Sequence, residues 1–359
     1  MKIYENSEYN KDVNEVANLN LPWKYLYNKT LLLSGATGLI GSCLIDVIMR
    51  KNADGMKCRI LALGRNSNKA YDRFKYCWED KLFNFISHDI KNPITLNDLD
   101  ANTVDYVLHL ASNTHPVQYS MDPIGTITTN IIGTYNMLEF AKKYKATRCL
   151  FASSNEIYGE NRGDIEKFDE EYCGYINSNT VRAGYPESKR CSEALCQAYI
   201  KQENMNIVIP RLTRSYGPTM LMTDTKAISQ FIRKGIKKEN IILKSAGNQY
   251  YSYTYVTDAV AGILTILLKG KTGEAYNIAD TTSDIKLKDL AGIIAEYVGE
   301  KVVFELPDEI EMGGYSTATK ARINGQKLQK LGWKASYDIQ SGVEHTIDIL
   351  KQINNVNLE

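Results

Sequence analysis

The feature that most constrains this fold is a glycine-rich stretch within residues 30–49. β-Favouring residues run into Gly35, Gly38 and Gly41, and an apolar helical pattern follows, which predicts a strand, a tight turn and a helix. Gly35 lets the chain reverse, Gly38 lets a pyrophosphate approach bare backbone, and Gly41 lets the helix lie close to the strand. Free N–H groups and the helix dipole favour an anion at the helix start. The stretch predicts a dinucleotide phosphate site, although other tight β–α turns also use glycines.

Apolar runs alternate with helical patterns through the next 160 or so residues, in the way expected of strands joined by crossover helices. Strands are expected at 58–64, 84–90, 105–112, 148–154 and 206–212, with helices at 123–143 and 185–201. Continuous apolar runs are typical of parallel strands buried on both faces. The prediction is an α/β fold with a Rossmann-type doubly wound parallel sheet and a ligand at the carboxyl ends of its strands.

A smaller C-terminal α/β lobe is expected after Leu212, where the alternation becomes looser. Its expected elements are a turn at 215–220, a helix near 227–234, strands at 251–256, 274–279 and 301–306, a helix at 287–298 and a final helical part around Gly332 and Trp333. The expected domains are an N-terminal extension (1–28) held against the first strand, a dinucleotide-binding domain (29–212 with about 248–279) and a substrate-binding lobe (213–247 with 280–359). Since no flexible linker is visible, the lobes are expected to form one rigid unit with a cleft.

Composition excludes several classes of partner. The 43 basic and 42 acidic residues nearly balance and form no basic tract, so neither nucleic acid nor a membrane surface is expected. The N-terminus lacks the pattern of a signal peptide, and no apolar run approaches the roughly 20 residues that cross a bilayer. The seven cysteines have no close C-x-x-C spacing, so neither a disulfide framework nor a metal site is indicated. A cytoplasmic protein is expected.

Tyr185 and Lys189 are four residues apart in YPESK, so on a helix they share one face. A lysine ammonium beside a phenol is expected to lower the phenol's pKa, and a nicotinamide cation would lower it further. The resulting phenolate could take a proton from a substrate hydroxyl. A helix that carries Tyr and Lys without any function is the alternative, because the chain has 24 tyrosines.

The segment ASSNEIYG, residues 152–159, follows the fifth expected strand, at the edge where this architecture places its chemistry. Ser154 could hydrogen-bond the same substrate hydroxyl that Tyr185 deprotonates. Glu156 could act as an acid or base on a neighbouring carbon. A buried serine satisfied by backbone is the structural alternative.

At this point the chain resembles the extended short-chain dehydrogenase/reductases of the NAD-dependent epimerase/dehydratase family, which modify nucleotide-linked sugars. The matching motifs are GATGLIG at 35–41, HDI at 88–90, HLAS at 109–112, SSNEIYG at 153–159, YPESK at 185–189, SYGP at 215–218, YVTD at 255–258 and LGW at 331–333. They occur in family order and span nearly the whole chain after residue 28. Within the family, the segments around residues 109–138 and 181–199 look most similar to UDP-glucuronate decarboxylases.

The resemblance implies a retained nicotinamide cofactor, a nucleotide-sugar substrate and a homodimer built from the helices around 123–143 and 185–201. Together with the residue patterns it yields three sets of candidate site residues. The catalytic set is Ser154, Glu156, Tyr185 and Lys189. The cofactor set is Gly35, Thr37, Gly38, Leu39, Ile40, Gly41, Arg65, Asp89, Ile90, Leu110, Ala111, Ser112, Tyr185 and Lys189. The substrate set is Tyr119, Asn155, Arg182, Arg214 and Tyr251.

Three positions depart from the family pattern. Arg65 follows Gly64 where an acidic residue usually meets the adenosine ribose, so a 2′-phosphate would no longer be repelled and either NAD or NADP is expected. Arg214 replaces the usual asparagine after the 206–212 strand, and Tyr251 replaces an arginine that usually meets the diphosphate. Arg214 is therefore expected to supply the displaced charge.

The shared first step would be oxidation at C4 of the sugar, after which decarboxylation, epimerisation or dehydration could follow. Asn155 disfavours dehydration, because the similar 4,6-dehydratases carry an aspartic acid there and an amide cannot protonate a leaving hydroxide. Decarboxylation is the leading hypothesis. A cofactor-binding relative without activity is the alternative of a different class, and retention of Ser154, Tyr185 and Lys189 argues against it.

Overall fold

The predicted strand, turn and helix at the N-terminal end of the fold are present in the computed structural model, which describes residues 1–307, 309–315 and 318–355. Strand β1 (Thr30–Ser34) leads through the glycine turn into helix α2 (Leu39–Ala53). Successive residues of β1 alternate between the two faces of the sheet: Leu31 packs into one hydrophobic cluster and Leu32 into another. An uninterrupted apolar run was required because both faces are buried.

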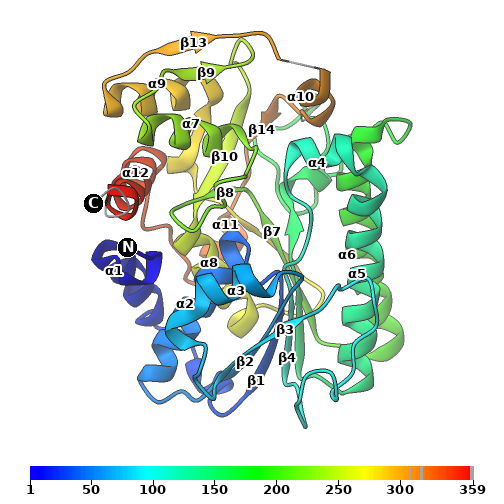
Figure 1. The fold of residues 1–359 in the computed structure, drawn as a ribbon. Coiled ribbons are helices and arrows are strands. Elements are labelled where there is room, and N and C mark those ends of the chain that lie inside the picture. The colour runs from blue at the N-terminus through cyan, green and yellow to red at the C-terminus, as the bar shows by residue number, and fades with distance from the viewer. Residues whose placement is uncertain (308, 316–317, 356–359) are drawn as a thin grey trace.

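The central sheet is parallel, with the order β11-β7-β5-β4-β1-β2-β3, and a short β6 also pairs with β7 (Figure 1). Its other strands are β2 (Arg59–Gly64), β3 (Phe83–Ser87), β4 (Tyr106–His109), β5 (Arg148–Phe151), β6 (Ser153–Ser154), β7 (Ile207–Leu212) and β11 (Ala275–Ile278). Pairing of Ser34 with both Leu63 and His109, and of His109 with Phe151, aligns the carboxyl ends of four strands. This edge positions the site.

Helices cover both faces of the sheet. Helices α5 (Pro123–Lys143) and α6 (Gly184–Glu203) lie together on one face, and α2 and α8 (Val256–Lys269) lie on the other (Figure 1). The remaining helices are α1 (Ser7–Ala17), α3 (Ser67–Phe74), α4 (Pro116–Met121), α7 (Ala227–Ile236), α9 (Leu287–Val298), α10 (Glu309–Gly314), α11 (Gln326–Gln329) and α12 (Ile339–Asn355). The doubly wound fold is therefore as predicted.

Two smaller sheets lie beyond the carboxyl edge of the central sheet. One consists of β8 (Arg214–Tyr216), β10 (Tyr250–Tyr255), β12 (Asp284–Lys286) and β14 (Lys320–Ala321), and the other of β9 (Ile241–Leu243) and β13 (Val302–Phe304). By pairing, residues 250–255 belong to the smaller sheet, although the predicted range 248–279 placed them with the dinucleotide-binding part. The division into domains stays a prediction.

Several predicted boundaries and elements were wrong. Strand β3 ends at Ser87, so residues 88–90 form a loop, and a strand at 214–216 occupies part of the predicted turn. Gly332 and Trp333 lie between α11 and α12 rather than in a helix, with Gly332 at φ +94°. A glycine in this left-handed conformation ends the preceding turn. Helix α8 was missed; it is strongly apolar, and every residue from Val256 to Leu268 is buried.

The N-terminal extension contains a helix that packs on other helices, and the expected hold against the first strand stays a prediction. Residues 7–17 form α1, which packs on α2 and α8 and lies beside the C-terminal helix α12 (Figure 1). Buried Asp12 accepts hydrogen bonds from Tyr255 Oη and Tyr337 Oη, both at 2.7 Å, and lies 3.0 Å from His345 Nε2. The extension therefore fastens the two ends of the chain to each other.

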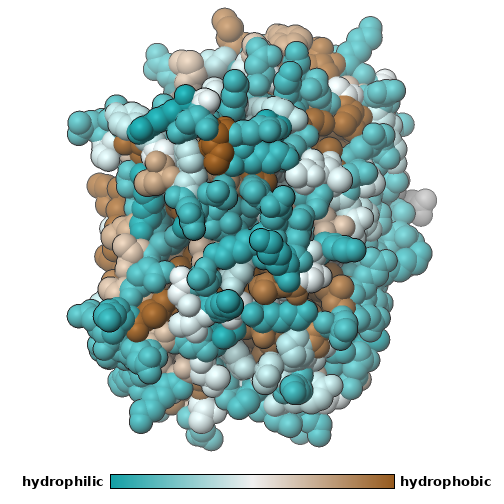
Figure 2. Space-filling model, turned by 180° about the vertical axis from the view of Figure 1, so that it is seen from behind, coloured by the Kyte–Doolittle hydropathy of each residue, from teal (hydrophilic) through white to brown (hydrophobic). Residues whose placement is uncertain are grey.

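The rear face of the molecule is mostly hydrophilic, with hydrophobic residues in separate patches (Figure 2). Among the residues that the structure describes, no helix has the length and apolar character to cross a membrane. The cytoplasmic location stays a prediction.

Candidate active site

A single cleft of about 790 Å³ runs from the glycine turn to the smaller sheet. Every candidate residue named from the sequence lines it. The cofactor set comes from β1–α2, the residue after β2, the loops after β3 and β4, and α6. The substrate set comes from α4, the turn after β6, the short turn before α6, β8 and β10. The structure thus brings the three sets together, and the role of each residue stays a prediction.

The glycine turn is shaped as a phosphate cradle. Gly35 has φ +78°, and a Cβ there would lie 2.8 Å from the backbone nitrogen of Ala111. A Cβ on Gly41 would lie 2.3 Å from the Gly35 carbonyl oxygen. Gly38 caps α2 without a side-chain hydrogen bond, which leaves the N–H groups at the helix start for a ligand. These observations fit a pyrophosphate on the turn.

The end of the cleft near β2 carries positive charge. Arg65 is exposed directly after β2, and Lys69, one turn into α3, also lines the cleft. Partial burial lowers the pKa of Lys69. Ile90 is buried, and its carbonyl accepts a hydrogen bond from Asn136 at 2.9 Å, which holds the loop after β3 in place. Sequence reasoning found Arg65 but missed Lys69.

Tyr185 and Lys189 lie one turn apart on α6, and both are buried. Lys189 Nζ donates to the Ala152 carbonyl at 2.8 Å. Ser154 Oγ accepts from the Glu156 backbone N–H at 3.2 Å, which starts the short turn at Asn155–Tyr158. The end of β5 and the start of α6 therefore meet at the predicted catalytic residues.

The predicted lowering of the Tyr185 pKa is not found. Burial and the charge of Glu156 raise the pKa of Tyr185 to about 12, although hydrogen bonds with Ser154 and Ser112 and the charge of Arg182 act in the opposite direction. Burial lowers the pKa of Lys189 to about 8. The ammonium of Lys189 bonds to a backbone carbonyl here instead of acting mainly on the phenol.

Arg182 connects Glu156, Tyr119 and the segment near α10 at one end of the cleft. Arg182 pairs with Glu156 at 2.5 Å, with side chains 12% and 18% exposed, so this ion pair is largely shielded from solvent. The guanidinium lies 4.9 Å from the Tyr119 ring centre, and the Tyr119 ring stacks on Tyr185 at 4.7 Å. Arg182 Nε also donates to the Tyr315 carbonyl, next to α10. Arg182 thus contacts both Glu156 and the segment at Tyr315, which also lines the cleft.

The substituted positions after β7 and in β10 contact each other. The Arg214 guanidinium lies 3.5 Å from the ring centre of Tyr251, a cation–π contact. With its amide oriented to satisfy both atoms, Asn155 donates to the Leu212 carbonyl at 3.2 Å and accepts from Arg214 at 3.0 Å. Arg214 therefore lies next to the catalytic turn.

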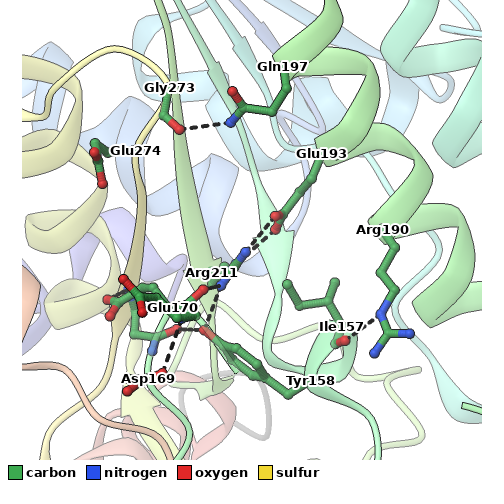
Figure 3. Close-up of polar contacts among 12 residues, drawn as sticks. Ile157, Tyr158, Asp169, Glu170, Arg190, Glu193, Gln197, Arg211, Gly273 and Glu274 are labelled. Atoms are coloured by element: carbon green, nitrogen blue, oxygen red, sulfur yellow. Dashed lines mark hydrogen bonds and ion pairs between the residues drawn. The ribbon is translucent and has the colours of Figure 1, made fainter. Parts of the chain in front are cut away.

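Behind the site, α6 is fastened to the sheet by a network of polar contacts (Figure 3). Arg211 on β7 forms two parallel hydrogen bonds with Glu193, at 3.0 and 2.7 Å, one helical turn beyond Lys189. Arg211 also donates to Tyr158 Oη at 3.0 Å. Arg190 donates to the Ile157 carbonyl at 2.7 Å. These bonds hold α6 against the turn at Asn155–Tyr158, which directly follows Ser154.

Comparison with known proteins agrees with this geometry. Residues 31–279 match the model of the NAD dependent epimerase/dehydratase family. The chain belongs to this family. It is therefore an enzyme of a family whose cofactor is NAD, and the glycine cradle described above fits that cofactor.

The most similar family members include two decarboxylases. UDP-glucuronic acid decarboxylase 1 of Xenopus tropicalis is 30% identical over 92% of this chain and 75% of its own length. UDP-glucuronic acid decarboxylase 5 of Arabidopsis thaliana is 31% identical over 88% of this chain and 87% of its own length.

Solved structures show the same fold. UDP-glucuronic acid 4-epimerase from Bacillus cereus, in complex with UDP-glucuronic acid and NAD, has a TM-score of 0.76 at 22% identity, over 90% of this chain and 99% of that one. The dTDP-glucose 4,6-dehydratase DesIV from Streptomyces venezuelae has a TM-score of 0.77 at 22% identity, over 91% and 98%.

Several cleft residues of this family member were not found from the sequence. His115 and Asp224 contact each other across the cleft, although they are 109 positions apart. Lys226 and Lys244 also line it. His115 follows a predicted strand end, which is a weak signal for a site residue. Asp224 lies in a loop whose sequence carries no signal of its position.

Proposed function

We propose that this enzyme is a nucleotide-uronate decarboxylase of the UDP-glucuronate type, which oxidises the sugar at C4, releases the carboxyl group from C5 and leaves a nucleotide pentose. The Arg182 guanidinium, largely buried beside Glu156 and Tyr119 at the sugar end of the cleft, carries this proposal. A substrate carboxylate requires such a cation in a site shielded from water. Identity of 30–31% with decarboxylases supports the same reaction.

The residues of this chain account for the proton transfers at C4. Bound NAD would supply a reversible acceptor for the hydride of C4. Tyr185 takes the proton of the C4 hydroxyl, and Ser154 hydrogen-bonds the same oxygen. Because burial raises the pKa of Tyr185 to about 12, the positive charge of Arg182 and the hydrogen bonds from serines are the groups that favour the phenolate.

The structure supports decarboxylation over dehydration at Asn155. Its amide is engaged by the Leu212 carbonyl and by Arg214, so it is a fixed structural group. An amide also has no acidic proton for a leaving hydroxide. Epimerisation at C4 remains the other outcome of the experiment below, because it uses the same oxidation.

The test is incubation of the purified enzyme and NAD with UDP-glucuronate that carries deuterium at C4. We expect release of carbon dioxide and a UDP-pentose that retains deuterium at C4, without net accumulation of reduced cofactor. A product of unchanged mass would identify an epimerase instead. Loss of water from UDP-glucose or dTDP-glucose would identify a dehydratase.

We also propose that the enzyme is a homodimer that pairs through α5 and α6. In support, α5 exposes apolar side chains at Ile124, Ile132 and Tyr135, with exposed fractions of 75%, 41% and 47%. Apolar groups spaced in this way on one helix are typical of a helix–helix interface. In sedimentation experiments the wild type should be a dimer. Ile132→Glu should be a monomer, because it places a charge in the proposed interface.

A further inference from the structure

A histidine and an aspartate from distant parts of the sequence contact each other in the cleft and have no role in the mechanism above. His115 is the residue before α4, in the loop that follows β4, and Asp224 lies shortly before α7. His115 Nδ1 lies 3.1 Å from Asp224 Oδ1. Both residues line the same cleft as Ser154 and Tyr185. The pair therefore faces the space in which a substrate would lie.

The surroundings of Asp224 keep its side chain in the charged carboxylate form. Its side chain is buried, and Lys226 Nζ lies 2.6 Å from Oδ2 while the Lys226 backbone N–H donates to Oδ1 at 2.9 Å. Burial alone would raise the pKa of Asp224, but the bonds from His115 and Lys226 outweigh it and hold that pKa well below its usual range. A permanent carboxylate accepts the Nδ1 proton of His115, which fixes the orientation of the ring.

The second ring nitrogen of His115 is open. No residue in the described parts of the chain hydrogen-bonds Nε2 of His115, and the side chain is 24% exposed. His109 provides the contrast, because its Nε2 is sealed in the core without a partner. An imidazole with one nitrogen held by a carboxylate and the other facing a cleft is the arrangement expected of an acid–base group.

The pair lies next to the catalytic helix. His115 precedes Tyr119 by one turn at the start of α4, and the Tyr119 ring stacks on Tyr185 at 4.7 Å. The charge of Asp224 contributes to raising the pKa of Tyr119, after burial, Tyr185 and Glu156. His115 is therefore near the sugar end of the cleft rather than the adenine end.

Decarboxylation creates a need for a proton that the residues assigned so far do not meet; this step rests on the function proposed above. The bond from C5 to the carboxyl carbon breaks, carbon dioxide leaves, and the electron pair forms an enolate over C5, C4 and O4. Tyr185 is assigned to the C4 oxygen. Glu156 was expected from the sequence to act as an acid or base on a neighbouring carbon, but here it is the ion-pair partner of Arg182. A separate acid is needed at C5.

We propose that His115 is this acid and that Asp224 is its positioning residue. The protonated imidazole gives its Nε2 proton to C5, the enolate electron pair forms the new C–H bond, and the 4-ketone is restored. The imidazole is left neutral, keeps its Nδ1 proton in the hydrogen bond to the Asp224 carboxylate, and regains the Nε2 proton from water. Histidine suits this step because both of its charge states are accessible near neutral pH.

The test follows one turnover of UDP-glucuronate in D₂O with the wild type and with His115→Gln. The wild type should place one deuterium at a single position on C5. In the variant, cofactor reduction and carbon dioxide release should proceed at wild-type rates, whereas UDP-pentose formation should fall at least about a hundredfold. The residual product should carry deuterium at either C5 position, and added imidazole should restore the rate.

His345→Gln is the matched control, because His345 also pairs with a buried aspartate but lies outside the cleft. It should behave as the wild type does. Asp224→Asn should keep carbon dioxide release, slow pentose formation and weaken the stereochemical preference at C5. His115→Asn provides a second variant if His115→Gln does not fold.

Two outcomes would overturn the inference while leaving the proposed function intact. One is stereospecific deuterium at the wild-type rate in His115→Gln. The other is loss of cofactor reduction in that variant, which would make His115 a substrate-binding residue. Absence of carbon dioxide release from the wild type would instead remove both proposals.

Discussion

The cleft has two walls that are built in different ways. The cofactor wall consists of the cofactor set of residues, and the substrate wall consists of the substrate set together with His115 and Asp224. The cofactor wall comes from strand ends and the turns that follow them, so each of its parts is encoded within a few adjacent residues, as at Gly35–Gly41. The substrate wall is assembled across long sequence separations, as in the contact of His115 with Asp224 and that of Arg214 with Tyr251. The first wall therefore departs from the family pattern at Arg65 alone, whereas the second holds the departures at Arg214 and Tyr251.

This difference shows where specificity resides. A dinucleotide needs the same cradle in every member of a family, so Gly35 and Gly41 tolerate little change. The substrate wall can exchange groups as long as charge and shape are kept. The expected family pattern has an asparagine at 214 and an arginine at 251. In this chain the cation is at 214, and Arg214 lies over the ring of Tyr251.

The largest effect should come from the point where both walls meet, at Tyr185. Tyr185→Phe removes the group that exchanges a proton with the C4 hydroxyl, so turnover should fall at least about a hundredfold. Cofactor binding and the melting temperature should stay near wild type, because the ring still stacks on Tyr119. Steady-state kinetics and NAD titration check this. Near-normal turnover would remove Tyr185 from the mechanism.

The next effect should be confined to the substrate wall. Arg214→Asn restores the usual family residue but removes a cation while Tyr251 remains, so we expect KM for UDP-glucuronate to rise about 10- to 100-fold, a loss of about 1.5–3 kcal/mol for a charged hydrogen bond. NAD affinity should not change. Tyr251→Phe is the control, because it retains the ring on which Arg214 lies. An unchanged KM in Arg214→Asn would place the nucleotide diphosphate elsewhere.

The same contrast explains what sequence could predict. Helices 123–143 and 287–298 have the predicted bounds, because amphipathic spacing is a local signal. The candidate residues also gather in one cleft as expected, since parallel strand ends share an edge. The pairing of His115 with Asp224 could not be predicted, because no local pattern links residues so far apart.

Tertiary context also reversed one electrostatic expectation. The spacing of Tyr185 and Lys189 correctly predicted a shared helix face, but the spacing could not show how deeply the phenol is buried. Burial and Glu156 dominate the pKa of Tyr185, and Lys189 bonds to the Ala152 carbonyl. Distances and burial, rather than residue types, decide the sign of such a shift.

A smaller effect, on cofactor affinity, is expected at Arg65, the position of the cofactor wall that departs from the family pattern. If Arg65 meets a 2′-phosphate, Arg65→Ala should weaken NADP binding about tenfold and leave NAD binding nearly unchanged, since an exposed ion pair contributes little. Lys69→Ala tests the neighbouring cation in the same way. Fluorescence titration with each cofactor measures this. Equal losses for both cofactors would show that Arg65 contacts the adenine instead.

The smallest effect should come from outside both walls, where Asp12 joins the chain ends. The hydrogen bond that His345 Nε2 donates to the Asp12 carboxylate raises the pKa of His345. A histidine whose pKa is raised on folding contributes stability that is fully present below its unfolded pKa of about 6.5 and is lost as pH rises through the folded pKa. The advantage of wild type over His345→Gln should therefore be greatest in mildly acidic solution.

His345 is partly exposed, so this advantage should be about 1 kcal/mol or less. Urea unfolding of both proteins at several pH values around neutrality measures it. Asp258 also makes the folded protein less stable as pH rises. Burial raises its pKa to about 7, so its charged form is disfavoured in the folded state. Since both proteins retain Asp258, its contribution cancels in the difference.

A difference that does not change with pH would mean that His345 contributes only by packing. Loss of turnover in His345→Gln under folded conditions would show that the joined ends also shape the substrate wall.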